Sequence, residues 1–541
     1  MSKLKKMMPK KDDDKKVVNY MGGISYTLNP IDTLRMLASS SMFLEPKYYE
    51  RDSRDKLFVI DEHVLDYAII LPDSVTDTIS EKTKRTINDA LAYDYKRTLD
   101  LAVELRKTYN VRVMPQLIMV MAAMHANRVK FNEENPGLFR SLNLEVMQRA
   151  DEPACQFACW LWLNDWKKNG LPSVLKRSWK DRIEKMSAYE MSKYKNAEAG
   201  LINTIRVCHA AGATVGDLVE DGKLELKEEE HTWENLRSAG KSFKDIIGTI
   251  RMPHMALLRN LRNILNENPD DSALISKVME DLKKGVKNGK QFPFRYYSAW
   301  QAVKGDANAT VTDALEECID ISAEELLKLK GKTMCLTDNS GSAWGACTSE
   351  YGTTTIAAID NISSVIAASR SDEGWVGKFG DKLIRRSVSK RNGLLTQAEA
   401  LTKDRDDDVG GATENGIWIF FKEAIEKKEW WDNIFIFSDQ QAGHGGLYGI
   451  GEDYLIGGSS FALKASWGGA KYVDVLKLLK EYRAKVNPKV NFFTVQTAGY
   501  TNAVIPEFIY RGAVLTGWTG KEVSFAAKLI EQWDSIENKN Q

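Results

Sequence analysis

Apolar residues recur at three- and four-residue spacing through most of the chain between about residues 17 and 330. This period is that of amphipathic helices, so the first part of the chain is predicted to be almost entirely helical. Prolines stand near the expected starts or junctions of these segments, as helix boundaries predict. Many antiparallel helices without strands favour an α-solenoid of paired helices. The clearest predicted helices span 86–108, 113–129, 154–168, 198–209 and 255–266.

The pattern changes near residue 330, where short apolar runs begin to alternate with helical segments. The runs at 333–337, 432–438 and 489–496 predict buried strands. Such alternation is typical of a doubly wound parallel sheet with helices on its faces. The predicted fold class is therefore α plus α/β, with a boundary near 330. The helical segments between and after the strands lie at 353–369, 415–428, 471–485 and 520–533.

Size and charge narrow the possible functions. At 541 residues the chain is too long for a single core, so two or three domains are expected. Basic and acidic residues balance at 75 each, which confines any attraction to nucleic acid to local patches. No apolar run of about 18 residues appears, so no membrane span is predicted. Residues 1–16 are rich in lysine and lack the apolar stretch of a secretory signal, which predicts a disordered tail.

The six cysteines show no Cys-x-x-Cys spacing and therefore predict neither a zinc site nor a disulfide framework. Cys155 and Cys159 stand four apart in a predicted helix beside Trp160, without a histidine at ligand spacing. Core packing is favoured over metal ligation for this pair. A reducing compartment fits, and we expect a cytoplasmic location.

Oxygen-bearing side chains follow two of the predicted strands. Asp338, Ser340 and Ser342 form an Asp-x-Ser-x-Ser motif directly after the first strand, and Asp439 ends the second. Thr413 follows a Gly-Gly pair before another predicted helix. Carboxylates and hydroxyls at one sheet edge suit a hard divalent cation, and Mg²⁺ is the expected ion. The alternative is an empty polar cluster whose groups bond to each other or to water.

No catalytic residue is predicted. A phosphatase that used Asp338 as its nucleophile would need a second carboxylate two residues on as general acid–base, and Ser340 stands there. A hydroxyl cannot exchange protons in that way near neutral pH. The motif therefore argues against a phosphatase.

Basic residues gather in the middle of the helical part. Between residues 160 and 216 there are ten lysines and arginines against five acidic residues, while acidic residues concentrate between 217 and 234. Phosphate contacts require such a patch, and interleaved aromatic residues can stack on unpaired bases. The alternative is a solvated amphipathic face that keeps the helix soluble. The basic candidates are Lys176, Arg177, Lys180, Lys193 and Lys195, and the aromatic candidates are Trp179, Tyr189 and Tyr194.

Several segments together resemble the Ro autoantigen family, including its bacterial RNA-binding members. The helix at 252–261, Met-Pro-His-Met-Ala-Leu-Leu-Arg-Asn-Leu, is very similar to the most distinctive helix of that family. Asn-Tyr-Met-Gly-Gly at 19–23 looks like its N-terminal entry, and Phe-Pro-Phe at 292–294 looks like its His-Pro-Phe segment with Phe in place of His. The Asp338 motif, Thr413 and Asp439 match the metal-ion-dependent adhesion site of von Willebrand factor A domains. The resemblance covers nearly the whole chain.

The resemblance implies a TROVE domain at 17–330, built of HEAT-like helices closed into a monomeric ring, and a von Willebrand factor A domain at 331–541. It implies binding of small noncoding Y-like RNAs, passage of single-stranded ends of misfolded RNAs through the ring, and a 3′ exonuclease as partner. His209 matches a family histidine for which RNA contact is implied, and the alternative is a hydrogen-bonded histidine at a helix end. Arg259 and Arg262 stand three apart on one predicted helix and are further RNA candidates, with capping of a neighbouring helix as the alternative for Arg259. A different class of function stays open: a metal-dependent protein-interaction scaffold without RNA.

Overall fold

A computed structural model of the chain describes residues 16–18, 24–40, 78–164, 170–193, 200–220, 224, 231–289, 291–305, 307–345, 355–403, 409–410, 414–440, 454–464, 471–498, 502–506, 509–517 and 520–538. None of the helices in these ranges combines the length and the apolar character that crossing a membrane demands. Contacts divide the chain into two compact units. We call the unit formed by Pro30–Met252 the helical unit. The other, the mixed unit, comprises Pro253–Gln541 and the N-terminal residues up to Asn29.

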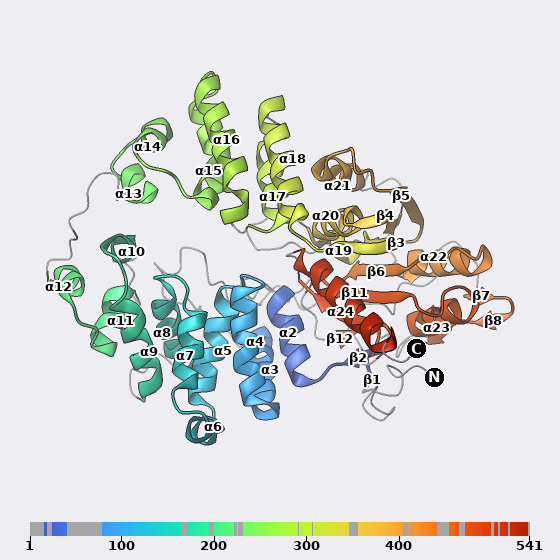
Figure 1. The fold of residues 1–541 in the computed structure, drawn as a ribbon, viewed down its shortest axis with the longest axis horizontal. Coiled ribbons are helices and arrows are strands. Elements are labelled where there is room, and N and C mark those ends of the chain that lie inside the picture. Colours follow the sequence, from blue (N-terminus) through green and yellow to red (C-terminus); the bar gives the residue numbers. More distant parts are fainter. Residues whose placement is uncertain are drawn as a thin grey trace. The chain divides into compact units, whose positions relative to one another are not determined.

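The described part of the helical unit consists of short helices (Figure 1). The single helix predicted over 86–108 is interrupted at Asp94, whose carboxylate accepts the Arg97 N–H and caps a new helix. Capping satisfies a backbone donor that the new helix would otherwise leave open. The helices are α2 (Pro30–Ser40), α3 (Thr78–Tyr93), α4 (Tyr95–Lys107), α5 (Val113–Met124), α6 (Arg128–Glu134), α7 (Leu138–Val146), α8 (Glu152–Leu163), α9 (Ser173–Ile183), α10 (Ala188–Lys193), α11 (Leu201–Cys208), α12 (Ala213–Glu220), α13 (Trp233–Ser238) and α14 (Phe243–Thr249).

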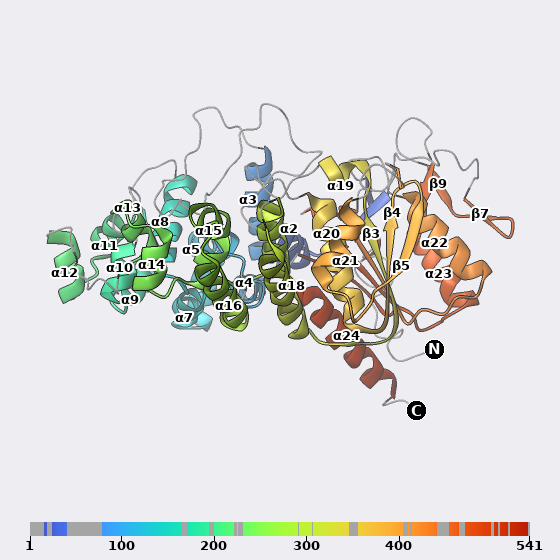
Figure 2. The ribbon, with the colours of Figure 1, turned by 90° about the horizontal axis from the view of Figure 1, so that it is seen from above.

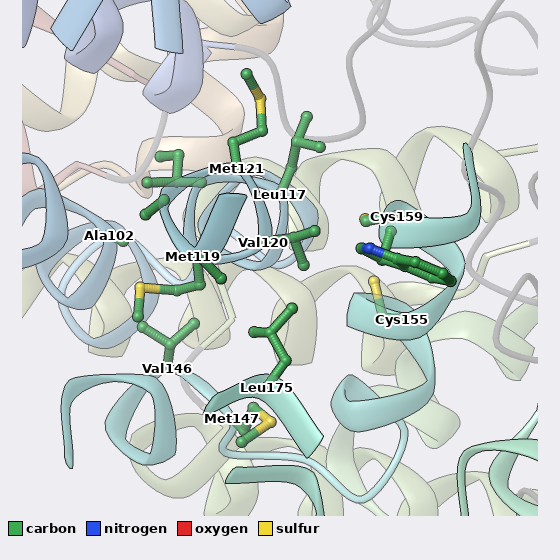
Figure 3. Close-up of a cluster of buried hydrophobic side chains, with 14 of the residues drawn as sticks. Ala102, Leu117, Met119, Val120, Met121, Val146, Met147, Cys155, Cys159 and Leu175 are labelled. Atoms are coloured by element: carbon green, nitrogen blue, oxygen red, sulfur yellow. The ribbon is translucent and has the colours of Figure 1, made fainter. Parts of the chain in front are cut away.

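Helices α5 and α8 form the centre of this unit, because nearly every residue of both is buried. Figure 3 shows side chains of α5 such as Leu117 and Val120 among those of neighbouring helices. Cys155 and Cys159 of α8 lie in the same apolar cluster, which confirms the prediction that they pack in a core. A hydrogen bond with Cys159, together with burial, holds the pKa of the Cys155 thiol well above its usual range, so the thiol stays protonated.

The mixed unit begins with four helices and continues into an α/β sheet. The helices are α15 (His254–Glu267), α16 (Ser272–Gly289), α17 (Pro293–Val303) and α18 (Ala309–Glu324). The sheet has the strand order β13-β11-β6-β3-β4-β5, and only the edge pair β4–β5 is antiparallel. Its strands are β3 (Leu329–Asp338), β4 (Ser371–Phe379), β5 (Leu383–Ser387), β6 (Asn433–Ser438), β11 (Asn491–Gln496) and β13 (Gly512–Thr516).

Helices cover both faces of this sheet (Figure 2). On one face lie α20 (Ile356–Ser369), which contacts β3 and β4, and α24 (Lys521–Asn538), which contacts β11 and β13. On the other face lie α22 (Glu414–Glu426) and α23 (Val475–Lys485), which contact each other. This arrangement confirms the predicted fold class, a helical region followed by a doubly wound, mostly parallel sheet. The remaining elements are α19 (Gly341–Gly345), α21 (Leu394–Lys403), β7 (Leu455–Ile456), β8 (Ser459–Ser460), β9 (Ala462–Lys464) and β10 (Lys471–Val473).

The N-terminal residues differ from the helical prediction. Lys16–Val18 and Ile24–Thr27 form strands β1 and β2, and β2 also pairs with β12 (Asn502–Ala503). Backbone pairing with a distant strand overrides local preference here, which a periodicity within one segment cannot reveal. The predicted tail lies outside the described residues, except for Lys16 at the start of β1.

The change from helices to strands falls where the sequence places it, since α18 ends at Glu324 and β3 begins at Leu329. The division by contacts falls elsewhere, between Met252 and Pro253. Helices α17 and α18 contact α20 and α21 of the α/β part, so the four helices before the sheet pack with it. The secondary structure therefore changes near residue 330, while contacts group α15–α18 with the sheet.

Candidate functional site

A cluster of polar side chains lies at the carboxyl ends of β3 and β6, the two central strands. From β3 the chain runs outward through β4 and β5, and it then returns to β6 on the other side of β3. In open α/β sheets the crevice outside such a reversal point is where ligands bind. The structure places Asp338 at the end of β3 and Asp439 directly after β6, at this point.

Hydrogen bonds hold the Asp338 carboxylate on both sides. The Ser340 backbone N–H donates to Oδ1 at 2.9 Å, and the Ser438 hydroxyl donates to Oδ2 at 2.6 Å. The Ser340 and Ser342 hydroxyl oxygens lie 3.2 Å apart, and both side chains are buried with Asp439. We call Asp338, Ser340, Ser342, Ser438 and Asp439 the strand-end cluster. Contacts join Asp338 to Ser340 and Ser438, and the charge of Asp439 acts on Asp338.

A second set of hydrogen bonds holds Asn339, the residue between Asp338 and Ser340. Asn339 and Asn361 of α20 exchange side-chain hydrogen bonds of 2.9 and 3.1 Å. The Thr337 hydroxyl donates to Asn361 at 2.9 Å, and Asn361 donates to the Thr402 hydroxyl of α21 at 3.2 Å. Paired buried amides of this kind hold the loop in one conformation, because breaking them would leave polar groups unsatisfied.

The electrostatics of the strand-end cluster favour a cation. Burial, followed by the charge of Asp439, raises the pKa of Asp338 to about 7, against the opposing hydrogen bonds from Ser438 and Ser340. Two buried carboxylates this close repel each other, and a cation between them would relieve that repulsion. Carboxylate and hydroxyl oxygens are also the ligands that Mg²⁺ prefers. The residues present thus fit a hard divalent cation.

The fifth predicted ligand, Thr413, lies outside the described residues, whereas Val409 and Gly410, a few residues before it, are described. A Cβ on Gly380, just past the end of β4, would lie 2.4 Å from the Gly410 carbonyl oxygen and 2.5 Å from that of Val409. Phe379, the residue before Gly380, is the register partner of Asp338. The chain that leads to Thr413 therefore passes one strand away from the strand-end cluster.

The basic candidates on α9 differ from each other in exposure and in contacts. Arg177 is exposed, while Lys176 and Lys180 are half-buried, and Lys180 lies 3.7 Å from the Glu184 carboxylate. Trp179 is fully buried and donates its indole N–H to Gln156 at 2.8 Å. The prediction that Trp179 stacks on unpaired bases is wrong, because every fourth residue of α9 faces the core of the helical unit.

The other RNA candidates are spread over both units. Lys193 is the last residue of α10, and its side chain, like all of Lys195 and Tyr194, lies outside what the structure describes. His209 is exposed and ends α11 in a left-handed conformation with φ of 53°. Arg259 and Arg262 are both exposed on α15, three residues apart and hence on one face of that helix.

Sequence reasoning missed three residues around the strand-end cluster: Ser438, Asn361 and Asp360. Ser438 directly precedes a predicted ligand, and its hydroxyl gave no signal apart from position. The two residues of α20 carried a stronger signal, since Asp360 and Asn361 stand in a mostly apolar helix that is buried all round. Polar residues inside a buried helix normally have a partner, and for Asn361 that partner is the loop after β3.

The chain thus combines a helical region with a doubly wound α/β unit that has polar side chains at its reversal point. Residues 220–339 match the family model of the TROVE domain. Among solved structures the chain is similar to the Ro protein RSR of Deinococcus radiodurans, with a TM-score of 0.52 and 15% identity, covering 93% of this chain and 100% of that one. No curated protein sequence matches. The predicted resemblance to the Ro family is confirmed, in sequence over 220–339 and in fold over most of the chain.

Proposed function

We propose that the protein is an RNA-binding protein of the Ro type. The observation that carries this proposal is the TROVE match over residues 220–339, which includes α15 with its exposed Arg259 and Arg262. The exposed Arg177 on α9 supports a separate phosphate contact in the helical unit. The proposed activity is binding and presentation of RNA, without cleavage.

The finer form of the proposal concerns the RNA. Small noncoding Y-like RNAs and misfolded RNAs with free single-stranded ends are the proposed ligands, and a separate 3′ exonuclease is the proposed partner in RNA quality control in the cytoplasm. A monomeric helical ring would admit a single strand but not a duplex. Unpaired RNA is also what proteins recognise most readily, because its bases and backbone are accessible.

Competition between two RNAs tests this proposal. A hairpin with a 3′ single-stranded tail and the same hairpin with a blunt end are mixed with the purified protein at about 150 mM salt, where diffuse attraction is screened. We expect the tailed hairpin to win clearly. Equal competition would contradict selection of RNA ends, and cleavage of either RNA by the pure protein would contradict a binding function.

We further propose that the α/β part is a von Willebrand factor A domain whose strand-end cluster, with Thr413, holds Mg²⁺. When bound, the ion would offer an open coordination position to an acidic group of a partner. Asp338 and Asp439 would carry most of the attraction, because a serine hydroxyl is a weak neutral ligand. Calorimetric titration with Mg²⁺ or Mn²⁺ should show binding to the unmodified protein and none to Asp338→Ala.

The strand-end cluster also favours a second candidate function, a metal-dependent scaffold that binds proteins and no RNA. The two functions separate in one measurement on protein purified without nuclease. A high absorbance at 260 nm that ribonuclease removes supports the RNA-binding function. Its absence, together with Mg²⁺ binding that depends on Asp338, favours the scaffold.

A further inference from the structure

Helix α20 carries a carboxylate next to the strand-end cluster that no metal motif includes. Asp360 lies in the second turn of α20 with none of its surface exposed. Within the part of the chain that the structure describes, no hydrogen bond of normal geometry reaches either of its carboxylate oxygens, and the Thr497 hydroxyl interacts with them only weakly. A buried carboxylate without a partner is costly, so this position calls for a compensating charge.

The surroundings of Asp360 place it with the two aspartates of the cluster. Burial and the charges of Asp338 and Asp439 all hold the pKa of Asp360 well above its usual range, and the Thr497 hydroxyl lowers it. No basic side chain is among the groups that act on it. Helix α20 contacts both β3 and β6, so carboxylates from three elements share one buried region.

We propose that Asp360 completes the cation site as a third carboxylate, which faces the bound ion from α20 across a water molecule. Direct ligation by all three aspartates does not fit the geometry, because the described residues contain no group of three His, Cys, Asp or Glu side chains arranged to hold a metal ion. Carboxylates one layer behind the ligands act through bridging water and strengthen a metal site. This inference rests on the proposed cation site at Asp338.

Three negative charges also determine which ion the site prefers. A divalent cation offsets two of them and a monovalent cation only one, so the site selects a divalent ion by charge. Without the ion, burial and the neighbouring carboxylates favour the protonated form of Asp360, so its ionisation costs the folded state free energy. Ion binding therefore stabilises the mixed unit, because a ligand that binds only the folded state shifts the folding equilibrium towards it.

Neutralising Asp360 without changing its shape separates its two effects. Asp360→Asn in the full chain should weaken Mn²⁺ and Mg²⁺ binding by roughly tenfold, as loss of an outer carboxylate does in other metal sites. In EDTA the melting temperature of this variant should equal or exceed that of the unmodified protein, since a buried carboxyl group that is costly to ionise is replaced by a neutral amide of the same shape. The matched control is Ser364→Ala, one turn further along α20 and also fully buried, which should leave ion affinity unchanged.

The outcomes distinguish this inference from the cation site on which it rests. No Mn²⁺ binding to the unmodified protein would overturn both. Binding that Asp338→Ala abolishes and Asp360→Asn leaves intact would overturn the role of Asp360 alone. A variant that melts earlier with and without the ion, at unchanged affinity, would make Asp360 a structural carboxyl group. If Asp360→Asn fails to fold, Asp360→Ser provides the same comparison with a smaller polar side chain.

Discussion

The Glu316 carboxylate of α18 accepts the backbone N–H of Leu395, in the first turn of α21, at 2.6 Å. Its second oxygen accepts the N–H and the hydroxyl of Thr396 at 3.1 and 2.7 Å. The first turn of a helix leaves its N–H groups open and is slightly positive, so a carboxylate from another element is a good cap. A helix before the sheet thus completes a helix of the α/β part, which explains why the two pack as one unit.

Loss of this cap should destabilise the mixed unit. Glu316→Ala leaves donors of α21 without partners and should cost about 2 kcal/mol of unfolding free energy. The control is Glu317→Ala, whose exposed carboxylate pairs only with Lys283 at 3.1 Å and should cost less than about 0.5 kcal/mol. Urea denaturation measures both values, and equal values for the two variants would contradict the capping role.

His254 makes stability depend on pH. Its Nε2 lies 2.8 Å from the Tyr296 hydroxyl, and burial lowers the pKa of His254 from 6.5 to about 4. Between these values the unfolded chain binds a proton that the folded protein does not. Stability is therefore full above pH 6.5 and falls as the pH drops towards 4, by about 2 kcal/mol once the partial exposure of the ring is allowed for.

Urea midpoints measured between pH 7 and pH 4 check this expectation. His254→Gln should flatten the pH dependence in that window, although it also lowers stability at pH 7. His209→Asn serves as the control, because that histidine is exposed and asparagine tolerates its left-handed backbone. A pH profile for His254→Gln that parallels the unmodified protein would rule out His254 as the titrating group.

Gly285 of α16 gives the ring of His254 its space. A Cβ at Gly285 would lie 2.4 Å from His254 Nδ1, whereas a Cβ at Gly248 of α14 would meet nothing within 4 Å. Alanine is the better helix former by about 1 kcal/mol, so the two substitutions should differ in sign. Gly285→Ala should lose about 1–3 kcal/mol through overpacking, and Gly248→Ala should gain up to about 1 kcal/mol. Thermal melts of both variants test this difference in sign. Stabilisation by Gly285→Ala would contradict the close packing of Gly285 against His254.

The sequence predicts the parts of this structure that depend on local periodicity. Helical spacing marks the helices before residue 330, and apolar runs mark the strands that carry Asp338 and Asp439. Strand β4 escaped prediction, since Ser371–Phe379 mixes charged, glycine and apolar residues. Its place in the sheet comes from pairing with β3, which a window of neighbouring residues does not contain.

The candidate site likewise combines residues that the local sequence predicts with residues whose position depends on tertiary packing. Two strands that end in aspartates are visible in the sequence, and the carboxyl edge of a parallel sheet brings them together. The partnership of Asn361 with Asn339, and the position of Asp360, depend on how α20 docks on the sheet. The orientation of Trp179 was available in the sequence: Leu175, Trp179 and Ile183 recur at four-residue spacing and are all buried. The basic residues beside this stripe favoured an exposed face and therefore an incorrect prediction for Trp179.

The basic residues of α9 lead to a separate prediction about RNA binding. Lys176 and Lys180 lie one turn apart with Arg177 beside them, on the side of α9 away from the buried stripe. If these residues bind phosphates, replacing all three with glutamine should weaken RNA binding. The triple substitution should also flatten the salt dependence of RNA affinity, by about 0.7 to 0.9 in log–log slope for each phosphate that is no longer neutralised.

The control for this triple variant is a second triple variant in the same unit. Lys96, Lys107 and Lys130 pair with Asp100, Glu145 and Glu134, so their charges are already opposed by acidic neighbours. Replacing them with glutamine removes the same net charge and should change the slope less. Binding isotherms of a tailed hairpin at several salt concentrations compare the two. Equal slopes for both variants would mean that total charge, and not the α9 surface, attracts the RNA, because localised phosphate binding must depend on which basic residues are replaced.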